Sequence, residues 1–330
     1  MYSLKKFAFS ISLMAILVVE STVAISDSSK FELPSAAAPF DTRRIEMITG
    51  LKGNYNPAET TFRASKARSD VSIEVDGDTL PSFFTLTTWA AFKPGKRSPL
   101  MMMGDFVVFP DEANAVMSIL LESGIDVTAL HNHFMYDEPH VFFMHFSGEG
   151  DLERLASVVR RGLDKIVEIR KFNPQPAKSF GNKALPPQSS ISPQPLEMIL
   201  GKAGVKKEGT LKVIWGGTTS MPCGCTVGSD MGVNTFAAFA GSDTNGVVFG
   251  DYFVHENELT PVLKSLRRSG IFIVAIHSHM SGENPRILYL HYWGRGPASE
   301  LAQAVKRALD VQNSQPQRSH LKCQLTHTSQ

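Results

Sequence analysis

The stretch that decides the fold is GDFVVFPDEANAVMSILLESGIDVTALHNH (residues 104–133), because the chain carries a related copy, GDYFVHENELTPVLKSLRRSGIFIVAIHSH, at residues 250–279. The match continues without a gap to residues 164 and 310, at a constant offset of 250 − 104 = 146 positions, and 22 of the 61 aligned positions are identical. Shorter upstream matches extend each copy to roughly 120 residues, the size of a domain rather than of a solenoid repeat. The sequence therefore predicts two tandem homologous units.

The remainder of the chain reads as flanking and connecting sequence. Six prolines with Ser, Gln and Asn lie between the two units, which is typical of a linker. The predicted order is a signal peptide at 1–24, a lead-in at 25–44, unit 1 at 45–171, a Pro-rich linker at 172–195, unit 2 at 196–310 and a polar tail at 311–330.

Within a unit, the hydrophobic pattern alternates between the periods of strands and helices. In unit 1 it predicts strands at 71–75, 105–109, 125–133 and 141–146, a helix over 113–121 that Gly124 ends, and a closing helix over 152–163. A strand-helix-strand-strand-helix order preceded by hairpins indicates an α+β fold. We expect an antiparallel sheet with helices packed on one face, loosely ferredoxin-like in its connectivity.

The composition is that of an ordinary folded protein. The chain has 330 residues, with 33 Lys and Arg against 32 Asp and Glu, and charged residues make up 20% of it. A net charge of +1 leaves no basic surplus for a phosphate backbone, so we expect no nucleic-acid partner.

The first 24 residues have the pattern of a secretory signal peptide. Two lysines precede an apolar run over residues 7–19, and small residues follow it, with Thr22 and Ala24 at the −3 and −1 positions of a cleavage site. The alternative is an uncleaved membrane anchor, but the run is shorter than the roughly 20 residues of a spanning helix. We expect export to the periplasm or the extracellular space, with no transmembrane span in the mature chain.

The three cysteines leave two interpretations open. Cys223 and Cys225 are two residues apart, and Cys323 lies far away in the polar tail. An oxidising compartment permits a disulfide, with one of the pair joined to Cys323 and one thiol left over. Alternatively, a Cys-x-Cys pair can hold a soft metal such as Cu(I).

Histidines mark the candidate site. Six of the ten fall at matching positions of the two units, namely His131, His133, His145, His277, His279 and His291. Residues i and i+2 of a strand point to one face, so the two histidines of each His-x-His lie side by side. If His131 pairs with Phe143, then Ala129 pairs with His145, and His145 joins the same face. A slip of one residue would send it to the other face.

Three neutral imidazoles on a rigid sheet suit a transition metal, and the residue types do not distinguish Zn, Cu, Fe and Ni. Asp137 and Glu283, in the adjoining loops, are candidates to support such ligands. His140 is a candidate fourth imidazole in unit 1. At the matching position of unit 2, Arg286 is a candidate anion-binding residue. The catalytic residues, if there are any, are not identified by the sequence.

The alternative is that the histidines are structural and hold each hairpin together through loop carbonyls. Other repeated polar positions also fit structural roles. Asp105 and Asp251 follow a glycine at the start of a strand, and Glu112 and Glu258 lie in the first turn of a helix, where a carboxylate favours the helix dipole.

The strings TALHNH (128–133) and FFMHF (142–146), with Pro139 and the upstream GDF (104–106), resemble the LppY/LpqO family, a bacterial family of exported domains of unknown function. The resemblance covers both units. Unit 2 departs where Ser278 replaces the usual Asn, and the chain lacks the lipid-attachment cysteine of the founding members. The resemblance implies an exported protein and supplies no established reaction.

Two functions therefore follow from the sequence. The first is an exported protein that binds a transition metal through its repeated histidines, as a metal-dependent hydrolase or an oxygen-handling enzyme. The second is a non-catalytic binding or envelope-interaction protein.

Overall fold

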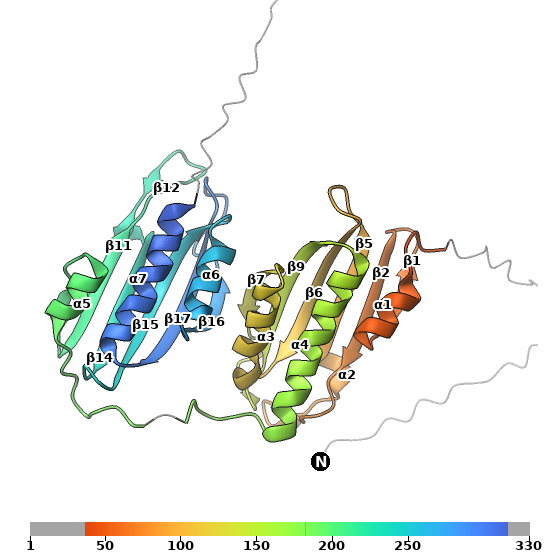
Figure 1. Ribbon diagram of the computed structural model, residues 1–330, viewed down its shortest axis with the longest axis horizontal. Helices are drawn as coiled ribbons and strands as arrows, with labels where there is room; N and C mark the ends of the chain where they lie inside the picture. Colours follow the sequence, from red (N-terminus) through yellow and green to blue (C-terminus); the bar gives the residue numbers. More distant parts are fainter. Residues whose placement is uncertain (1–36, 182, 316–330) are drawn as a thin grey trace, which may run out of the picture. The chain divides into compact units, whose positions relative to one another are not determined.

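The computed structural model describes residues 37–181 and 183–315 (Figure 1). The predicted signal peptide, most of the predicted tail and Cys323 lie outside these residues. Each repeat is an α+β unit in which helices lie along one face of an antiparallel sheet.

The first repeat contains four helices, α1 to α4, and nine strands, β1 to β9. In chain order they are α1 (Thr42–Thr49), β1 (Lys52–Asn56), β2 (Thr61–Ala67), β3 (Glu74–Val75), β4 (Asp78–Thr79), α2 (Ser82–Thr85), β5 (Thr87–Pro94), β6 (Leu100–Val108), α3 (Pro110–Glu122), β7 (Asp126–His131), β8 (Asp137–Glu138), β9 (Phe142–Gly150) and α4 (Leu152–Phe172).

The second repeat follows the same plan. Its elements are α5 (Pro193–Leu200), β10 (Val205–Lys207), β11 (Thr210–Gly216), β12 (Thr219–Ser220), β13 (Thr226–Val227), η1 (Ser229–Met231), β14 (Asn234–Gly241), β15 (Gly246–His255), α6 (Leu259–Arg268), β16 (Phe272–His277), β17 (Ile287–Gly296) and α7 (Ala298–Ser314).

Each repeat contributes six strands to the main sheet, and every pairing among them is antiparallel. The order is β1-β2-β5-β6-β9-β7 in the first repeat and β10-β11-β14-β15-β17-β16 in the second. The predicted core β6-α3-β7-β9-α4 is present. A ferredoxin-like unit would add a strand after its second helix. Here β5, which precedes the core, lies on that side of β6 instead.

Local sequence explains where the central helix begins and ends. Pro110 occupies the first turn of α3, where its missing N–H costs nothing, and the Glu112 carboxylate accepts a hydrogen bond from the Phe109 N–H at 2.9 Å. Gly124 follows the helix at φ +73°, a conformation that glycine adopts without a steric penalty. The next residues then form β7.

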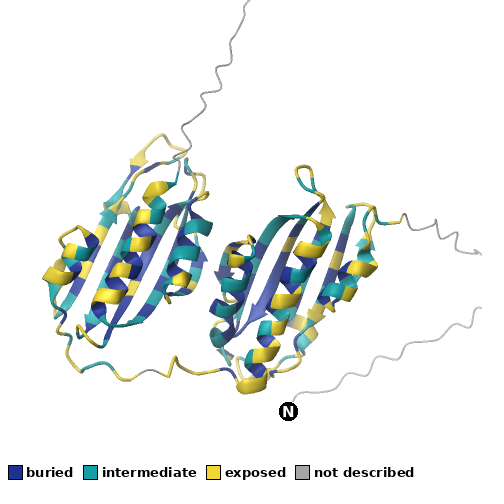
Figure 2. Cartoon of the chain, viewed as in Figure 1, coloured by how far each residue is buried: buried dark blue, intermediate teal, exposed yellow. Residues whose placement is uncertain are grey.

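Alternation along the strands separates two faces of each sheet. In β6, Phe106 and Val108 belong to the large core that also includes helix side chains, whereas Val107 and the following Phe109 belong to a smaller apolar cluster. Figure 2 shows buried sides of the helices against each sheet and exposed sides away from it. The opposite face is the one that carries the smaller cluster, and we call it the open face.

The segment 71–75, expected to be one strand, is a strand only at its end. Only Glu74–Val75 is a strand, and it pairs with β4 and β8 in a separate three-stranded sheet. Val71 and Ile73 pack with Val107 and Phe143 on the open face. Alternation correctly indicated a buried side, but it could not indicate which sheet the segment joins.

Two helices of the first repeat extend past the limits expected from apolar spacing. α3 covers Pro110–Glu122 rather than 113–121, and α4 runs to Phe172 rather than to residue 163. The sequence patterns did not predict α1 or α5. Terminal helical turns are rich in polar residues and so carry little hydrophobic signal.

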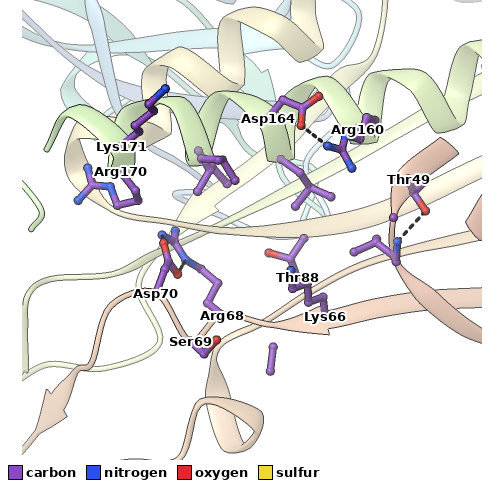
Figure 3. Close-up of a pocket in the computed structure, with 16 residues that line it drawn as sticks. Thr49, Lys66, Arg68, Ser69, Asp70, Thr88, Arg160, Asp164, Arg170 and Lys171 are labelled. Atoms are coloured by element: carbon purple, nitrogen blue, oxygen red, sulfur yellow. Dashed lines mark hydrogen bonds and ion pairs between the residues drawn. The ribbon is translucent and has the colours of Figure 1, made fainter. Parts of the chain in front are cut away.

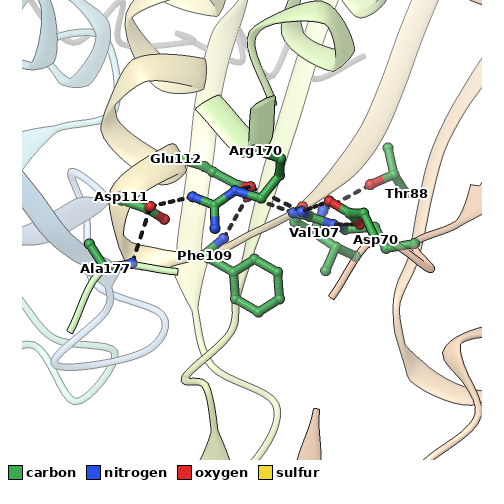
Figure 4. A network of polar contacts seen from close by, with 9 residues as sticks. Asp70, Thr88, Val107, Phe109, Asp111, Glu112, Arg170 and Ala177 are labelled. Carbon is green, nitrogen blue, oxygen red and sulfur yellow. Dashed lines mark hydrogen bonds and ion pairs between the residues drawn. The ribbon is translucent and has the colours of Figure 1, made fainter. Parts of the chain in front are cut away.

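The first repeat also contains a buried network of charged side chains (Figure 4). Glu112, whose side chain is fully buried, receives the Arg68 guanidinium at 2.5 and 3.0 Å and lies 2.9 Å from Arg170 Nε. Arg68 also bonds Asp70, and Arg170 also pairs with Asp111. At the matching position of the second repeat, Glu258 meets a neutral partner, the Gln312 amide, at 2.8 Å.

Candidate metal centre

The register of each histidine hairpin is the one that the sequence predicts. In the first repeat His131 pairs with Phe143 and Ala129 with His145. In the second repeat His277 pairs with Tyr289 and Ala275 with His291. The third histidine of each repeat therefore lies on the same face of the sheet as the His-x-His pair.

That face is the open face. His145 follows Phe143 by two residues, and His291 follows Tyr289 by two, and both aromatic residues belong to the smaller apolar clusters. Ring centroids confirm that the imidazoles gather there, with 5.0 Å between His131 and His145 and 4.7 Å between His277 and His291.

An aspartate joins each group from the neighbouring strand. Asp105 of β6 lies directly opposite His145 of β9, and Asp251 of β15 lies opposite His291 of β17. Both aspartates are buried, with 5% and 7% of their surface exposed. The sequence had favoured structural roles for these two residues. The cross-strand register instead brings them to the histidines.

In the second repeat the carboxylate lies beside two imidazoles. Asp251 Oδ2 lies 3.2 Å from His279 Nε2, and Asp251 Oδ1 lies 3.8 Å from His291 Nδ1. Ligand atoms of Asp251, His277 and His279 all lie within 4.8 Å of one another. Within residues 37–181 and 183–315, this is the one cluster of at least three His, Cys, Asp or Glu side chains that meets this spacing.

Three buried atoms in and beside this cluster have no hydrogen-bond partner. Asp251 Oδ1, His277 Nε2 and His291 Nδ1 are buried without a hydrogen-bond partner. Buried polar atoms are normally paired, so these three require an explanation. A metal ion bound between them would satisfy them together.

In the first repeat two of the rings contact each other instead. His131 Nε2 and His145 Nε2 are 2.9 Å apart, a hydrogen bond in which one ring donates. His133 lies flat on Phe143, with 3.3 Å between ring centroids, as His279 lies on Tyr289 at 3.5 Å. Asp105 Oδ1 is buried and has no hydrogen-bond partner. The same residue types are thus present in a different arrangement.

Burial disfavours the protonated form of one imidazole in each repeat. Burial lowers the pKa of His133, and the neighbouring His131 and His145 lower it further. Burial also lowers the pKa of His277, with His291 adding to the effect and Asp251 opposing it. Neutral imidazole is the form that binds metals. In the first repeat, burial raises the pKa of Asp105, against the opposing influence of the two nearest histidines.

The glycine before each aspartate is required by close packing. A Cβ on Gly104 would lie 2.2 Å from the Phe146 ring and 2.6 Å from the Trp89 carbonyl oxygen. A Cβ on Gly250 would lie 2.1 Å from the Phe236 carbonyl oxygen. The repeated Gly-Asp was therefore the sequence signal that could have found the aspartates, because it marks where β6 and β15 pass tightly between their neighbours.

The proposed supporting residues hold the loops rather than the rings. Asp137 accepts hydrogen bonds from the Val141 N–H at 2.7 Å and contacts His140 Nδ1 at 2.8 Å. Glu283 accepts a hydrogen bond from the Ile287 N–H at 3.1 Å. Both contacts span the turn between the two histidine strands.

The two residues expected to distinguish the sites lie apart from the clusters. The His140 ring packs edge-on against Phe142, with 4.7 Å between centroids, and its Nδ1 faces Asp137. Arg286 is exposed, and no ion pair to it occurs within the described part of the chain. Neither side chain belongs to the group that could hold a metal.

A cation over an aromatic ring borders each aspartate. The Arg63 guanidinium lies 3.7 Å from the centroid of Trp89, which pairs with Asp105. In the second repeat, Lys212 Nζ lies 4.1 Å from the centroid of Phe236, which pairs with Asp251. Each site therefore has positive charge at its margin, where an anionic group could be held.

Two cavities at matching positions of the repeats lie away from the histidines. One of about 550 Å³ lies in the first repeat between α4, the end of α1 and strands β2 and β5 (Figure 3). One of about 510 Å³ occupies the corresponding place in the second repeat, beside α7 and the end of α5. None of the six histidines lines either cavity.

Within the described ranges, no helix combines the length and apolar character that crossing a membrane requires.

Comparison with known proteins identifies the family but not an activity. No curated protein and no solved structure matches the chain significantly. One family profile matches twice, at residues 43–165 and 194–311, which confirms the internal duplication. The chain belongs to the family described as Domain of Unknown Function (DUF1259), and it carries two tandem copies of that domain.

Proposed function

We propose that the protein binds a divalent transition metal on the open face of its second repeat, through Asp251, His277 and His279. The observation that carries this proposal is that ligand atoms of these three side chains lie within 4.8 Å of one another, while two of their buried polar atoms, Asp251 Oδ1 and His277 Nε2, lack partners. His291, beside Asp251, is the fourth candidate ligand.

The donor set suits a site that does chemistry. Two imidazoles with one carboxylate occur both in zinc sites that activate water and in non-haem Fe(II) sites that handle oxygen. Three protein ligands leave a coordination position for water or a substrate. Lys212, over Phe236, would favour an anionic substrate at that position. The function is thus metal-dependent hydrolysis or oxygen chemistry, with the metal bound by this chain's own residues.

The setting of this function is also part of the proposal. The sequence of residues 1–24 is that of a signal peptide, so we propose that the mature protein is exported to the periplasm or the extracellular space. The histidine strings support a place in the LppY/LpqO family.

A second function is favoured by the stacked rings. His133 on Phe143 and His279 on Tyr289 are contacts that could stabilise the hairpins without any metal. In that case the protein would be a non-catalytic binding or envelope-interaction protein whose histidines are structural.

Metal titration of the mature, metal-free protein separates the two. The tightest site should bind about one equivalent of Zn(II) or Co(II). His277→Ala or His279→Ala should weaken binding at that site by at least about 100-fold, because losing a direct ligand should cost at least as much as losing an outer-shell contact. His255→Ala is the matched control, because His255 is a partly buried histidine of the same repeat that lines the cavity beside α7. It should leave binding unchanged.

The second function would be favoured by a different result. Bound metal below about a tenth of an equivalent at saturating metal, or binding that neither His277→Ala nor His279→Ala reduces, contradicts ligation by these imidazoles.

A further inference from the structure

A pair of exposed cysteines lies near the second histidine cluster, outside the proposed centre. Cys223 and Cys225 are both exposed and both free thiols. A single glycine, Gly224 at φ +83°, separates the two cysteines along the chain. The first repeat has no cysteine, so the pair is a feature of the second repeat alone.

The backbone holds the pair in a tight turn. Strands β12 and β13 pair as a short hairpin, with Thr219 opposite Val227 and Ser220 opposite Thr226. Inside it, the Met221 N–H donates to the Cys225 carbonyl at 2.9 Å, and the Gly224 N–H donates to the Met221 carbonyl at 2.8 Å. Both thiols therefore project from a fixed turn.

That hairpin is anchored to the loop that follows His279. The Asn284 N–H donates to the Ser220 carbonyl at 2.9 Å, and the Ser220 N–H donates back at 3.3 Å. The Thr219 hydroxyl donates to the Pro285 carbonyl at 3.0 Å. A pair of ligands fixed in advance loses less conformational entropy on binding than a mobile pair.

We propose that Cys223 and Cys225 form a two-coordinate site for Cu(I), separate from the Asp251 centre. Binding releases one proton from each thiol and places Cu(I) between two thiolate sulfurs, with no electron transfer. Soft thiolate ligands select soft ions such as Cu(I).

The surroundings of the pair favour Cu(I) over zinc. Structural zinc sites use four ligands in a tetrahedron. Among the residues that the structure describes, no third His, Asp or Glu completes a metal-binding cluster with the two cysteines. Two sulfurs without further donors fit an ion of low coordination number.

Competition for Cu(I) tests this inference. The mature chain is prepared with Cys323→Ser throughout, which removes the third thiol, and is titrated anaerobically with Cu(I) against a chromophoric Cu(I) chelator. One equivalent should bind. Cys223→Ser or Cys225→Ser should lower the affinity by at least about 100-fold, as expected for loss of a ligand. The double variant His277→Ala/His279→Ala should retain Cu(I) binding within about twofold, which keeps this test separate from that of the histidine site.

Serine is close in size to cysteine, and both positions are exposed, so the variants should melt at the temperature of the parent protein. Two results would overturn the proposal. One is unchanged Cu(I) affinity in both serine variants. The other is a thiol count of zero in the Cys323→Ser protein purified anaerobically without reductant, which would show that Cys223 and Cys225 are joined as a disulfide.

Discussion

The two repeats carry the same histidines on the same strands but arrange them differently. In the second repeat, Asp251 lies within 3.2 Å of His279 Nε2 and draws the ligand atoms together. In the first, His131 and His145 form a hydrogen bond with each other at 2.9 Å. Rings that satisfy each other are less available to a metal, because binding would first break that contact. The same residues thus occur in both repeats, while the local contacts make the second repeat the better candidate for the proposed metal site.

The repeats also differ in how they are stabilised. The first buries a network of Arg68, Glu112 and Arg170, whereas the second buries Glu258 against the Gln312 amide. The cavity beside the network has five basic lining residues, Lys66, Arg68, Arg160, Arg170 and Lys171, while its counterpart has Lys306 as its one Lys or Arg. The first repeat thus has a buried network of charged side chains on the helix side of its sheet. The second repeat has the proposed metal ligands on its open face.

The largest expected effect concerns that buried network. Glu112→Gln should lower the free energy of unfolding by about 3–5 kcal/mol, because it leaves two buried guanidinium groups without their shared carboxylate. Glu258→Gln in the second repeat loses hydrogen bonds to neutral partners and should cost about 1 kcal/mol. Urea denaturation of both variants measures the difference. Equal losses would contradict the distinction drawn between the two networks.

The next effect concerns the aspartates. Asp251→Asn should weaken the tightest bound Zn(II) by at least about 100-fold, while Asp105→Asn should change that binding by less than about twofold, because the repeat 1 rings are already paired. Calorimetric titration of both variants checks this. If Asp105→Asn has the larger effect, the ranking of the two sites is reversed.

A smaller and equal effect is expected at the two glycines. Gly104→Ala and Gly250→Ala should each lower the free energy of unfolding by about 1–3 kcal/mol, because the added Cβ would overlap a neighbouring carbonyl oxygen. Thermal unfolding of each variant is the measurement. A stable Gly250→Ala protein beside an unstable Gly104→Ala protein would show that the two aspartate strands are not held alike.

The smallest effect concerns pH. The pKa values of His133 and His277 lie below the usual value, so the unfolded chain binds protons near pH 6.5 before the folded chain does. The metal-free protein should therefore lose stability as the pH falls below about 6.5. The raised pKa of Asp105 has the opposite effect, because it adds stability as the pH falls, so the measurement is made in an Asp105→Asn variant. In that variant, a Tm that increases as the pH is lowered from 7.5 to 5.5 would contradict the lowered pKa values of the two histidines.

The sequence predicted the part of the site that lies within one hairpin. His131, His133 and His145 belong to two consecutive strands, and the length of the connecting loop with the buried side of each strand was enough to set their register. The repeated Gly-Asp marks Asp105 and Asp251, but the sequence could not show that they lie opposite the histidines, because the pairing of their strand is set by the order of strands in the whole sheet. The prediction of a strand at 71–75 was wrong for most of its length for a similar reason. The alternation correctly marks buried side chains, but this segment covers the open face instead of extending the main sheet.

The most direct test of the central claim is an anomalous-scattering map from crystals of the mature protein grown with Zn(II), recorded at the zinc edge. The account predicts the strongest peak at Asp251, His277 and His279, with nitrogen and oxygen ligands at about 2.0–2.2 Å. Saturating Zn(II) that gives no peak there, or a strongest peak bound by other side chains, would contradict it.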